Sequence, residues 1–281
     1  MYAFPIGAML DSFKTDIKTA IQKAAAVGAT GVQLYATRGD HSPEKLTPAR
    51  KKEILSMMQD SGLVFSALCG DFGQGFCDRE KNPVLIEKSK RILDLAKEFG
   101  TDVVTTHIGV VPEDPSHDRY KIMQEACFSL SQYADSLNAH FAIETGPEPA
   151  KTLKTFLDSL GSTGVAVNLD PANLVMVTGD DPVQAVYTLK DYIVHTHAKD
   201  GHMLSGQDIE RLYGQNADTY KGRRYIELPL GEGDVDFPNY LKALDEIGYK
   251  GFLTIEREVG DDPAADIQKA ADFLRKTIQS N

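Results

Sequence analysis

The chain has 281 residues and a formal net charge of −11, with 30 lysines and arginines against 41 aspartates and glutamates. Its length suits one large α/β domain, and a composition that is 42% hydrophobic and 25% charged excludes disorder as the main state. The acidic balance disfavours a surface that binds nucleic-acid phosphates, because such a surface needs clustered lysine and arginine. We therefore expect no nucleic-acid partner.

The sequence gives no sign of membrane insertion or of disulfide bonds. No run approaches the roughly 20 apolar residues that cross a bilayer. Residues 1–10 show neither a basic leader nor a long apolar stretch, so we expect a cytoplasmic protein with no membrane partner. Cys69, Cys77 and Cys127 are odd in number and lack CxxC spacing, which predicts reduced thiols.

A repeated pattern organises the chain from end to end. An amphipathic run stops, usually at glycine or asparagine, and a short apolar strand follows within a few residues. In chain order, the predicted strands cover residues 3–7, 31–35, 64–68, 103–107, 141–144, 165–169, 192–197 and 252–256. Near-continuous apolar strands alternating with helices are typical of a parallel sheet that is covered by helices.

The segments between these strands are predicted to be helical. Near the end of the chain, apolar residues fall at i, i+3, i+4 and i+7, which places them on one helix face. These residues are Ile267, Ala270, Ala271 and Leu274. Prolines stand where a first helical turn would begin, a position at which the missing N–H costs nothing. They are Pro48, Pro182, Pro238 and Pro263.

The eight predicted strands indicate a single closed (β/α)8 TIM barrel over residues 1–281. The alternative is an open doubly wound sheet, which usually carries a glycine-rich turn after its first strand, whereas residues 8–11 read Ala-Met-Leu-Asp. Residues 200–230 form a long loop after strand 7, and connections of this length commonly serve as lids or binding loops. We interpret the Gly-x-Gly within residues 231–236 as a turn, because no strand precedes it in a Rossmann arrangement.

Five of the predicted strands end in a polar residue that could act as a ligand. These residues lie 6 to 9 positions after the end of the preceding helix, and they are His107, Glu144, Asp170, His197 and Glu256. The carboxyl ends of barrel strands meet at one mouth, where the chemistry of such proteins takes place. Each residue alone could equally be an N-cap or a solvated loop residue. Together, embedded in apolar strands, they predict a shared site.

The predicted site contains more negative charge than a barrel core tolerates. Glu144, Asp170 and Glu256 would repel one another unless a cation lay between them. His195 and His197 share one strand face, and His197 is nearer the mouth, so it is the ligand candidate while His195 fits a core histidine. Three oxygen donors and one imidazole suit one divalent ion such as Mn, Co or Mg, with Zn as an alternative.

Five motifs, in this order and at these intervals, resemble the xylose-isomerase-like TIM-barrel superfamily and, within it, the sugar phosphate isomerase and epimerase family. The resemblance covers essentially the whole chain. The motifs are Ile-Glu-Thr-Gly at 143–146, Asn-Leu-Asp-Pro-Ala-Asn at 168–173, His-Thr-His-Ala-Lys-Asp at 195–200, Leu-Gly-Glu-Gly-Asp-Val-Asp at 230–236 and Thr-Ile-Glu at 254–256.

The resemblance implies a mononuclear metal held by Glu144, Asp170, His197 and Glu256, which match the family's ligand quartet position by position. It also implies that the two glutamates move protons, as in the family's ketose epimerases. Many relatives carry histidine three residues after the aspartate, whereas this chain has Asn173, so a second metal is not implied there. The superfamily's DNA-repair endonucleases bind three zinc ions with a much richer set of histidines. The 7 histidines and the acidic balance of this chain disfavour that branch.

The implied chemistry is proton transfer next to the carbonyl of a small ketose or polyol ketone. The metal would act as a Lewis acid and stabilise the enediolate that forms when the proton leaves. Return of the proton to the opposite face would be epimerisation, and return to the neighbouring carbon would be isomerisation. The alternatives are a dehydratase of the inosose or dehydroshikimate type and a non-catalytic sugar-binding barrel.

Four further residues are predicted to surround the substrate. His107 could bind a substrate hydroxyl or be structural. Lys199 could offset substrate or carboxylate charge, or it could be a solvated or ion-paired lysine. Asp71 fits a turn cap better than a substrate contact, while Asn173 occupies the place of the family's histidine.

The long loop carries Lys221, Arg223 and Arg224, which could grip a phosphate or carboxylate or could form an exposed basic loop. Alternation turns Glu258 inward with Glu256 if the last strand continues that far. A homo-oligomer is compatible with the sequence, which does not separate exposed apolar helix faces from the packing of the barrel itself.

Overall fold

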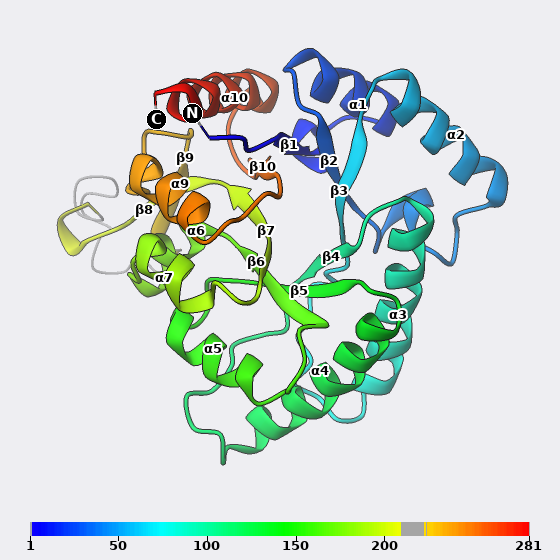
Figure 1. The fold of residues 1–281 in the computed structure, drawn as a ribbon, viewed down its shortest axis with the longest axis vertical. Coiled ribbons are helices and arrows are strands. Elements are labelled where there is room, and N and C mark those ends of the chain that lie inside the picture. Colours follow the sequence, from blue (N-terminus) through cyan, green and yellow to red (C-terminus); the bar gives the residue numbers. More distant parts are fainter. Residues whose placement is uncertain (1, 209–221, 223, 281) are drawn as a thin grey trace.

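The computed structural model describes residues 2–208, 222 and 224–280, and in this part of the chain eight parallel strands form a closed barrel surrounded by helices (Figure 1). In spatial order the strands are β1 (Ile6–Met9), β10 (Leu253–Ile255), β7 (Ile193–Ala198), β6 (Val165–Leu169), β5 (His140–Glu144), β4 (Val103–Thr106), β3 (Val64–Cys69) and β2 (Gly31–Tyr35). The predicted TIM barrel is confirmed, and the open sheet is wrong because β1 pairs with both β2 and β10.

The prediction of the first strand differs most from the structure, whereas the other seven predicted strands agree with it to within one residue at each end. The first strand was expected at residues 3–7, but β1 spans Ile6–Met9. Phe4 is buried, so the apolar pattern begins before the strand does. Pro5 has no N–H to donate, although its carbonyl accepts a hydrogen bond from Leu253 N at 2.9 Å. Because β1 begins later than expected, it also ends later, at Met9, shortly before Asp11.

The helices cover the outside of the barrel. They are α1 (Ile17–Ala26), α2 (Pro48–Asp60), α3 (Asn82–Glu98), α4 (Asp118–Ser136), α5 (Ala150–Asp158), α6 (Pro171–Asn173), α7 (Pro182–Leu189), α9 (Phe237–Glu246) and α10 (Pro263–Gln279). Short 3-10 turns cover Leu10–Phe13 and Gly39–His41, and a π turn covers Leu174–Thr178. Pro48, Pro182 and Pro263 each begin a helix, and Pro238 is the second residue of α9, as predicted.

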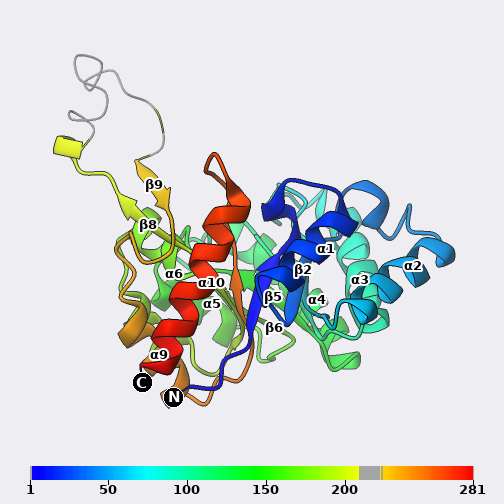
Figure 2. The ribbon, with the colours of Figure 1, turned by 90° about the horizontal axis from the view of Figure 1, so that it is seen from above.

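The last helix shows how these helices pack against the barrel. Asp262 caps α10 by accepting a hydrogen bond from Ala265 N at 3.1 Å. The predicted apolar face is buried, with Ile267, Ala271 and Leu274 each 0% exposed. Tyr2 N donates to Ile278 O at 3.3 Å, and the two ends of the chain lie side by side in Figures 1 and 2.

A hairpin interrupts the connection that follows β7. It consists of β8 (Asp200–Met203) and β9 (Tyr225–Leu228), which pair in antiparallel fashion, and it stands away from the barrel (Figure 2). The predicted lid at residues 200–230 therefore contains regular structure at its base. Lys221 and Arg223, two of the three basic residues predicted to grip an anion, lie outside the described residues.

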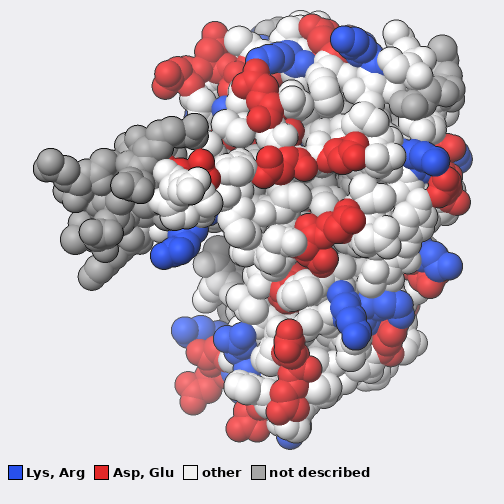
Figure 3. Space-filling view, turned by 90° about the vertical axis from the view of Figure 1, so that its left-hand side faces the viewer, with Lys and Arg blue, Asp and Glu red and all other residues white. Residues whose placement is uncertain are grey.

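Within the described residues, no helix has the length and apolar character needed to span a bilayer. Cys69, Cys77 and Cys127 are all free, as expected. Acidic groups are spread over the face in Figure 3, with basic side chains scattered between them.

Candidate metal centre

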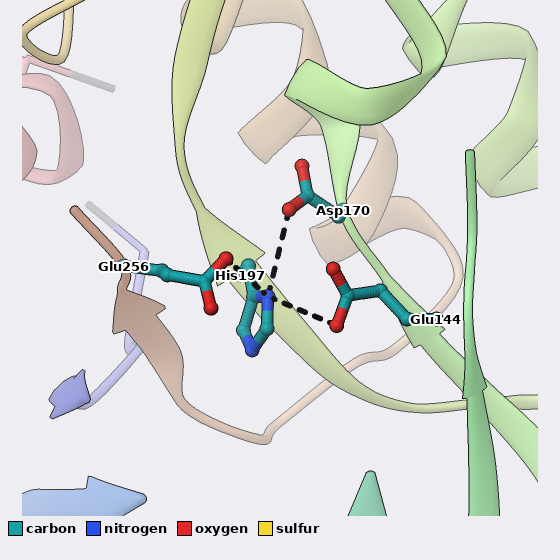
Figure 4. A group of neighbouring side chains, drawn as sticks. All are labelled: Glu144, Asp170, His197 and Glu256. Atoms are coloured by element: carbon teal, nitrogen blue, oxygen red, sulfur yellow. Dashed lines mark ion pairs between the residues drawn. The ribbon is translucent and has the colours of Figure 1, made fainter. Parts of the chain in front are cut away.

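Four side chains meet at the C-terminal ends of four adjacent barrel strands (Figure 4). Glu144 ends β5, Asp170 directly follows β6, His197 lies near the end of β7 and Glu256 directly follows β10. One ligand atom of each residue lies within 4.8 Å of the ligand atoms of the others, and no residue is more than 8% exposed. The structure thus brings together the four residues that the sequence selects as metal ligands.

His197 Nδ1 occupies the centre of this cluster. It lies 3.4 Å from Glu256 Oε2, 3.5 Å from Asp170 Oδ2 and 3.7 Å from Glu144 Oε2. Ligands at about 2.1 Å from one ion stand roughly 3 to 3.5 Å apart. The observed spacing therefore accommodates a cation between the donors after small side-chain movements.

Two atoms of the cluster have no hydrogen-bond partner among the described residues. They are His197 Nδ1 and Asp170 Oδ2, and both residues are fully buried. A buried polar atom without a hydrogen-bond partner lowers the free energy of unfolding by about 1–3 kcal/mol. Asp170 Oδ1 accepts from Asn173 N at 3.0 Å, so this residue also caps α6 with one of its two oxygens. The second oxygen and the imidazole nitrogen face each other, which fits a divalent cation.

The surroundings shift the pKa values of the two glutamates in opposite directions. Burial raises the pKa of Glu144 above its ordinary value. Burial would also raise the pKa of Glu256, but the Lys199 ammonium and His197 hold it well below the usual range. Burial would lower the pKa of His197, but Glu256 and Glu144 raise it well above its ordinary value. A cation that binds the imidazole would displace the proton held there by this negative charge.

A neutral side chain from the other side of the barrel orients His197. Gln33 on β2 donates from Nε2 to Thr105 Oγ1 at 2.8 Å, so its Oε1 accepts from His197 Nε2 at 3.1 Å. Asn168 Nδ2 lies 3.3 Å from the same ring nitrogen. The shorter contact with the Gln33 acceptor favours a proton on Nε2, which leaves Nδ1 to face the carboxylates. The sequence analysis missed Gln33. The available signal was a single amide inside the apolar strand 31–35.

His195 is a core histidine, as expected. Its Nδ1 donates to Asn168 Oδ1 at 2.8 Å, and its Nε2 accepts from Thr254 Oγ1 at 2.9 Å. Burial lowers the pKa of His195 well below its ordinary value, so the ring is neutral. Asn168 also donates from Nδ2 to Glu144 Oε2 at 3.3 Å, which connects the core histidine to the metal cluster.

Strand irregularities precede both amides of this inner layer. The register between β2 and β3 shifts between Val32 and Gln33, and the register between β6 and β7 shifts between Val167 and Asn168. Such irregularities change the direction of the side chains that follow them and are common next to active sites. They account for the way in which two amides converge on His197 from opposite sides of the barrel.

Three of the residues predicted to surround a substrate lie around Glu144. Asn173 Nδ2 donates to Glu144 Oε1 at 2.9 Å, and His107 Nε2 lies 3.5 Å from the same oxygen. His107 Nδ1 lies 3.4 Å from Asp71 Oδ2, while Asp71 Oδ1 accepts from Gly73 N at 2.9 Å. Asp71 is therefore both a turn cap and a contact of His107. The negative charge of Glu144 raises the pKa of His107 to about 9, and the ring is 44% exposed at the mouth.

Lys199 lies on the other side of the cluster, next to Glu256. Its side chain is only 4% exposed, and its Nζ donates to Glu256 Oε2 at 2.9 Å and to Glu258 Oε2 at 2.8 Å. Lys199 is therefore an ion-paired lysine that offsets buried carboxylate charge, and the solvated alternative is wrong. The last strand, β10, ends at Ile255, so the alternation that would turn Glu258 inward does not extend to it. Its side chain is 57% exposed, although its Oε2 accepts from Lys199.

A cavity of about 200 Å³ opens beside Glu256, between the segments that follow β1, β2 and β10. It is lined by Met9, Asp11, Ser12, Lys14, Tyr35, Arg38, Glu256, Arg257 and Glu258. Arg38 stacks on Tyr35, with its guanidinium carbon 3.9 Å from the ring centre, and Arg38 Nη2 donates to Asp11 Oδ1 at 3.0 Å. The cavity therefore has polar walls next to a predicted ligand.

The sequence model of the xylose isomerase-like TIM barrel matches residues 21–277. A putative L-ribulose-5-phosphate 3-epimerase of Escherichia coli is 23% identical over 270 residues, which are 91% of this chain and 89% of that protein. An inosose dehydratase of Clostridium perfringens is 24% identical over 165 residues, which are 54% of each chain.

Solved structures show the same fold. A xylose isomerase domain protein from Planctomyces limnophilus has a TM-score of 0.80 at 24% identity, covering 99% of this chain and 98% of that one. At this level of identity the likeness establishes the fold alone.

Proposed function

Because this chain belongs to the xylose isomerase-like TIM-barrel family, we propose that it is a divalent-metal-dependent isomerase or epimerase of a ketose or polyol ketone. One observation carries the proposal: in the buried cluster of Glu144, Asp170, His197 and Glu256, two facing ligand atoms have no hydrogen-bond partner in the part of the chain that the structure describes. A buried group of charges is costly unless it is compensated, and a cation provides that compensation. The name of the E. coli relative supports the same class of reaction.

The four residues of the cluster would hold one ion. Three carboxylate oxygens and one imidazole nitrogen favour Mn, Co or Mg, with Zn as an alternative. When bound, the ion supplies positive charge against the negative charge that develops on the substrate oxygens as the α-proton leaves. Gln33 keeps the Nε2 proton on His197 and so keeps Nδ1 available.

Glu144 and Glu256 are proposed to move the proton. Their strands, β5 and β10, are separated by β6 and β7 in the barrel, so the two carboxylates reach the centre from different sides. One removes the proton and the other returns it to the opposite face, which is the requirement for epimerisation. The ammonium of Lys199 favours the ionised form of Glu256, as a proton acceptor needs.

The remaining residues are proposed to hold the substrate. His107 and Asn173 lie on either side of Glu144 and present N–H groups at the mouth. The cavity beside Glu256 offers room for the part of the substrate that is remote from its carbonyl. Donors fixed in this way orient hydroxyl groups and keep the reacting carbon between the two carboxylates.

A metal-dependent dehydratase is the second candidate, because the similarity to an inosose dehydratase covers 54% of the chain. Dehydration begins with the same removal of an α-proton and then expels a β-hydroxyl. The two reactions therefore share residues and differ in their products.

Solvent exchange tests the step that both reactions share. The full chain, loaded with Mn²⁺, is incubated in D2O with a panel of ketoses and inososes, and the α-proton is followed by NMR after the metal is removed. We expect exchange with at least one substrate, accompanied by an epimer or isomer for the first candidate and by loss of water in the mass spectrum for the second. No exchange with any member of the panel, together with tight sugar binding, would favour a non-catalytic sugar-binding barrel.

Glu256→Gln provides the matched variant for this test. It should lower the exchange rate by about 100-fold or more, because general acid–base catalysis contributes 10²–10⁴-fold. Glu232→Gln is the control, because Glu232 is exposed and pairs only with Lys269 in the described residues. Full activity of Glu256→Gln would remove Glu256 from its proposed role.

A further inference from the structure

Beside the metal cluster lies a second group of charged side chains, of which the proposed reaction uses only Lys199. Its members are Lys199, Glu227, Arg257, Glu258 and Asp266. The side chains of Lys199, Glu227 and Arg257 are 4%, 5% and 9% exposed. Charges buried to this extent interact strongly and are poorly screened by salt. Their arrangement therefore influences any charged group next to them.

Glu227 joins the two cations of this group. Its Oε1 accepts from Arg257 Nη1 at 2.7 Å and from Glu258 N at 3.0 Å, and its Oε2 lies 3.9 Å from Lys199 Nζ. Arg257 is itself held by Asp266 Oδ2, which accepts from its Nε at 2.8 Å. Glu227 is thereby fixed next to Lys199 by groups that belong to the barrel.

Lys199 extends this group to the metal cluster. Its Nζ donates to Glu256 Oε2 at 2.9 Å, and the same oxygen lies 3.4 Å from His197 Nδ1. An ammonium and a divalent cation that share one carboxylate oxygen compete for its negative charge. The strength with which Lys199 holds Glu256 therefore affects the affinity of the cluster for a cation.

Glu227 belongs to the hairpin β8–β9, whose base is tied to the barrel by Asp200. The Asp200 carboxylate accepts four backbone hydrogen bonds at 2.9–3.1 Å, from Gly201, Gly231, Gly233 and Val235. A Cβ on Gly233 would lie 2.1 Å from Asp200 Oδ1, so only glycine fits there. The Gly-x-Gly of residues 231–236 is thus a turn that wraps Asp200 and holds the end of β9 near Lys199.

We propose that Glu227 is a positioning residue of the metal site, which acts through Lys199 to set the negative charge that Glu256 offers to a divalent cation. The inference rests on the proposed function, because it concerns the same site. Without the charge of Glu227, Lys199 has one carboxylate fewer to interact with and holds Glu256 more tightly. The surroundings of the site also become more positive by one unit of charge. Both changes weaken cation binding.

Mn²⁺ binding to the full-length protein tests this proposal without any substrate. Free Mn²⁺ is titrated by electron paramagnetic resonance against wild type, Glu227→Gln and the exposed control Glu232→Gln. Glu227→Gln should weaken Mn²⁺ binding by about 10-fold, within the range known for groups that support metal ligands, while Glu232→Gln should change it by less than about twofold. Equal affinities for wild type and Glu227→Gln would overturn the proposal.

A double-mutant cycle separates action through Lys199 from a general structural effect. In a Lys199→Met background, Glu227→Gln should change the Mn²⁺ affinity by no more than about twofold, because the intermediary is gone and only the direct effect of the Glu227 charge remains. The same 10-fold loss in both backgrounds would contradict a role through Lys199. If Glu227→Gln fails to fold, Glu258→Gln removes the exposed partner of Lys199 and should weaken Mn²⁺ in the same direction by about twofold or more. Unchanged binding in Glu258→Gln would then count against the proposal.

Failure of this inference is distinguishable from failure of the proposed function. A protein that exchanges α-protons but binds Mn²⁺ equally well with and without Glu227 keeps its function and loses the positioning role. A protein that loses Mn²⁺ affinity in Glu227→Gln but exchanges no α-proton with any ketose keeps the positioning role and loses the function.

Discussion

The two halves of the barrel treat charge in opposite ways. The adjacent strands β5, β6, β7 and β10 end in the three carboxylates and the imidazole of the cluster. Within its strands, the other half, β1 to β4, contributes neutral groups to the same interior, of which Gln33 and Thr105 are the clearest. Two of its ionisable residues near the cluster, Asp71 and His107, lie beyond the ends of β3 and β4 at the mouth. The amide and hydroxyl do not bind the ion in our account. They fix the imidazole that does.

This difference teaches how a barrel core can contain charge. A buried carboxylate is tolerated where a cation or several donors compensate it, and the ligand half concentrates such groups at one point. The neutral half supplies hydrogen bonds of fixed direction without adding charge, which selects the nitrogen of His197 that faces the carboxylates. If this division is correct, substitutions in the two halves should differ in size and in kind.

The largest effect is expected in the ligand half, from Asp170→Asn. The amide keeps the Oδ1 cap of α6 but removes the charge of the unpartnered Oδ2, so Mn²⁺ affinity should fall by at least about 100-fold. The metal-free protein should become more stable by roughly 1–3 kcal/mol, because an uncompensated buried charge is removed. Isothermal titration with Mn²⁺ and thermal unfolding in EDTA measure the two quantities.

Asp170→Asn is thus expected to lower the affinity for Mn²⁺ while it raises the stability of the metal-free protein. Wild type at 100 times its dissociation constant should gain about 2.7 kcal/mol of stability from Mn²⁺, and Asp170→Asn should gain almost none. If Asp170→Asn binds Mn²⁺ like wild type, the carboxylate is not a ligand and the division between the halves fails.

A smaller effect is expected in the neutral half, from Gln33→Leu. The change removes the acceptor for His197 Nε2 and leaves the ligand set intact, so Mn²⁺ affinity should fall by about 10-fold. Gln33→Glu retains an acceptor at the same position and should restore much of the affinity. Loss of affinity as large as that of Asp170→Asn, or no loss at all, would show that the neutral half does not play the supporting role assigned to it.

The smallest effect concerns Glu148, a buried carboxylate outside the cluster, whose Oε1 has no partner among the described residues. Burial raises its pKa from 4.5 to about 7, so the folded state binds the proton more tightly than the unfolded state does. Stability is then fully present below pH 4.5 and falls as the pH rises towards about 7.

Glu148→Gln should therefore stabilise the protein at pH 8 by about 1 kcal/mol and change little at pH 4. The amide oxygen can still accept the hydrogen bond from Val111 N. Urea unfolding at the two pH values measures the difference, with Glu232→Gln as the exposed control. A stabilisation of equal size at both pH values would show that ionisation of Glu148 is not its cause.

The ligand half was predictable from the sequence because its residues break a strong pattern. Asp170 and Glu256 each follow an apolar strand at a similar distance from a helix end, so the barrel geometry alone brings them to one mouth. In the His-Thr-His run the two histidines share one strand face, so His197 was distinguished from His195 by its position nearer the mouth, and the structure places His195 in the core as expected.

The supporting residues were not predictable, because their roles depend on contacts between distant segments. Gln33 reaches His197 across 164 positions of sequence, and a strand irregularity directs it there. Glu227 lies in a segment without clear periodicity, and its partner strand β8 ends more than 20 residues earlier. An isolated glutamate in such a segment carries no signal of burial. The start of β1 was also predicted too early, because Phe4 is buried without belonging to the strand, and an apolar pattern does not distinguish the two.

The central claim is that Glu144, Asp170, His197 and Glu256 hold one divalent ion, and anomalous diffraction from crystals grown with Mn²⁺ tests it most directly. We predict a single strong peak per chain, with donor atoms of all four residues at about 2.1–2.4 Å. A structure without a peak among these four side chains, or with the ion bound elsewhere in the barrel, would contradict the account.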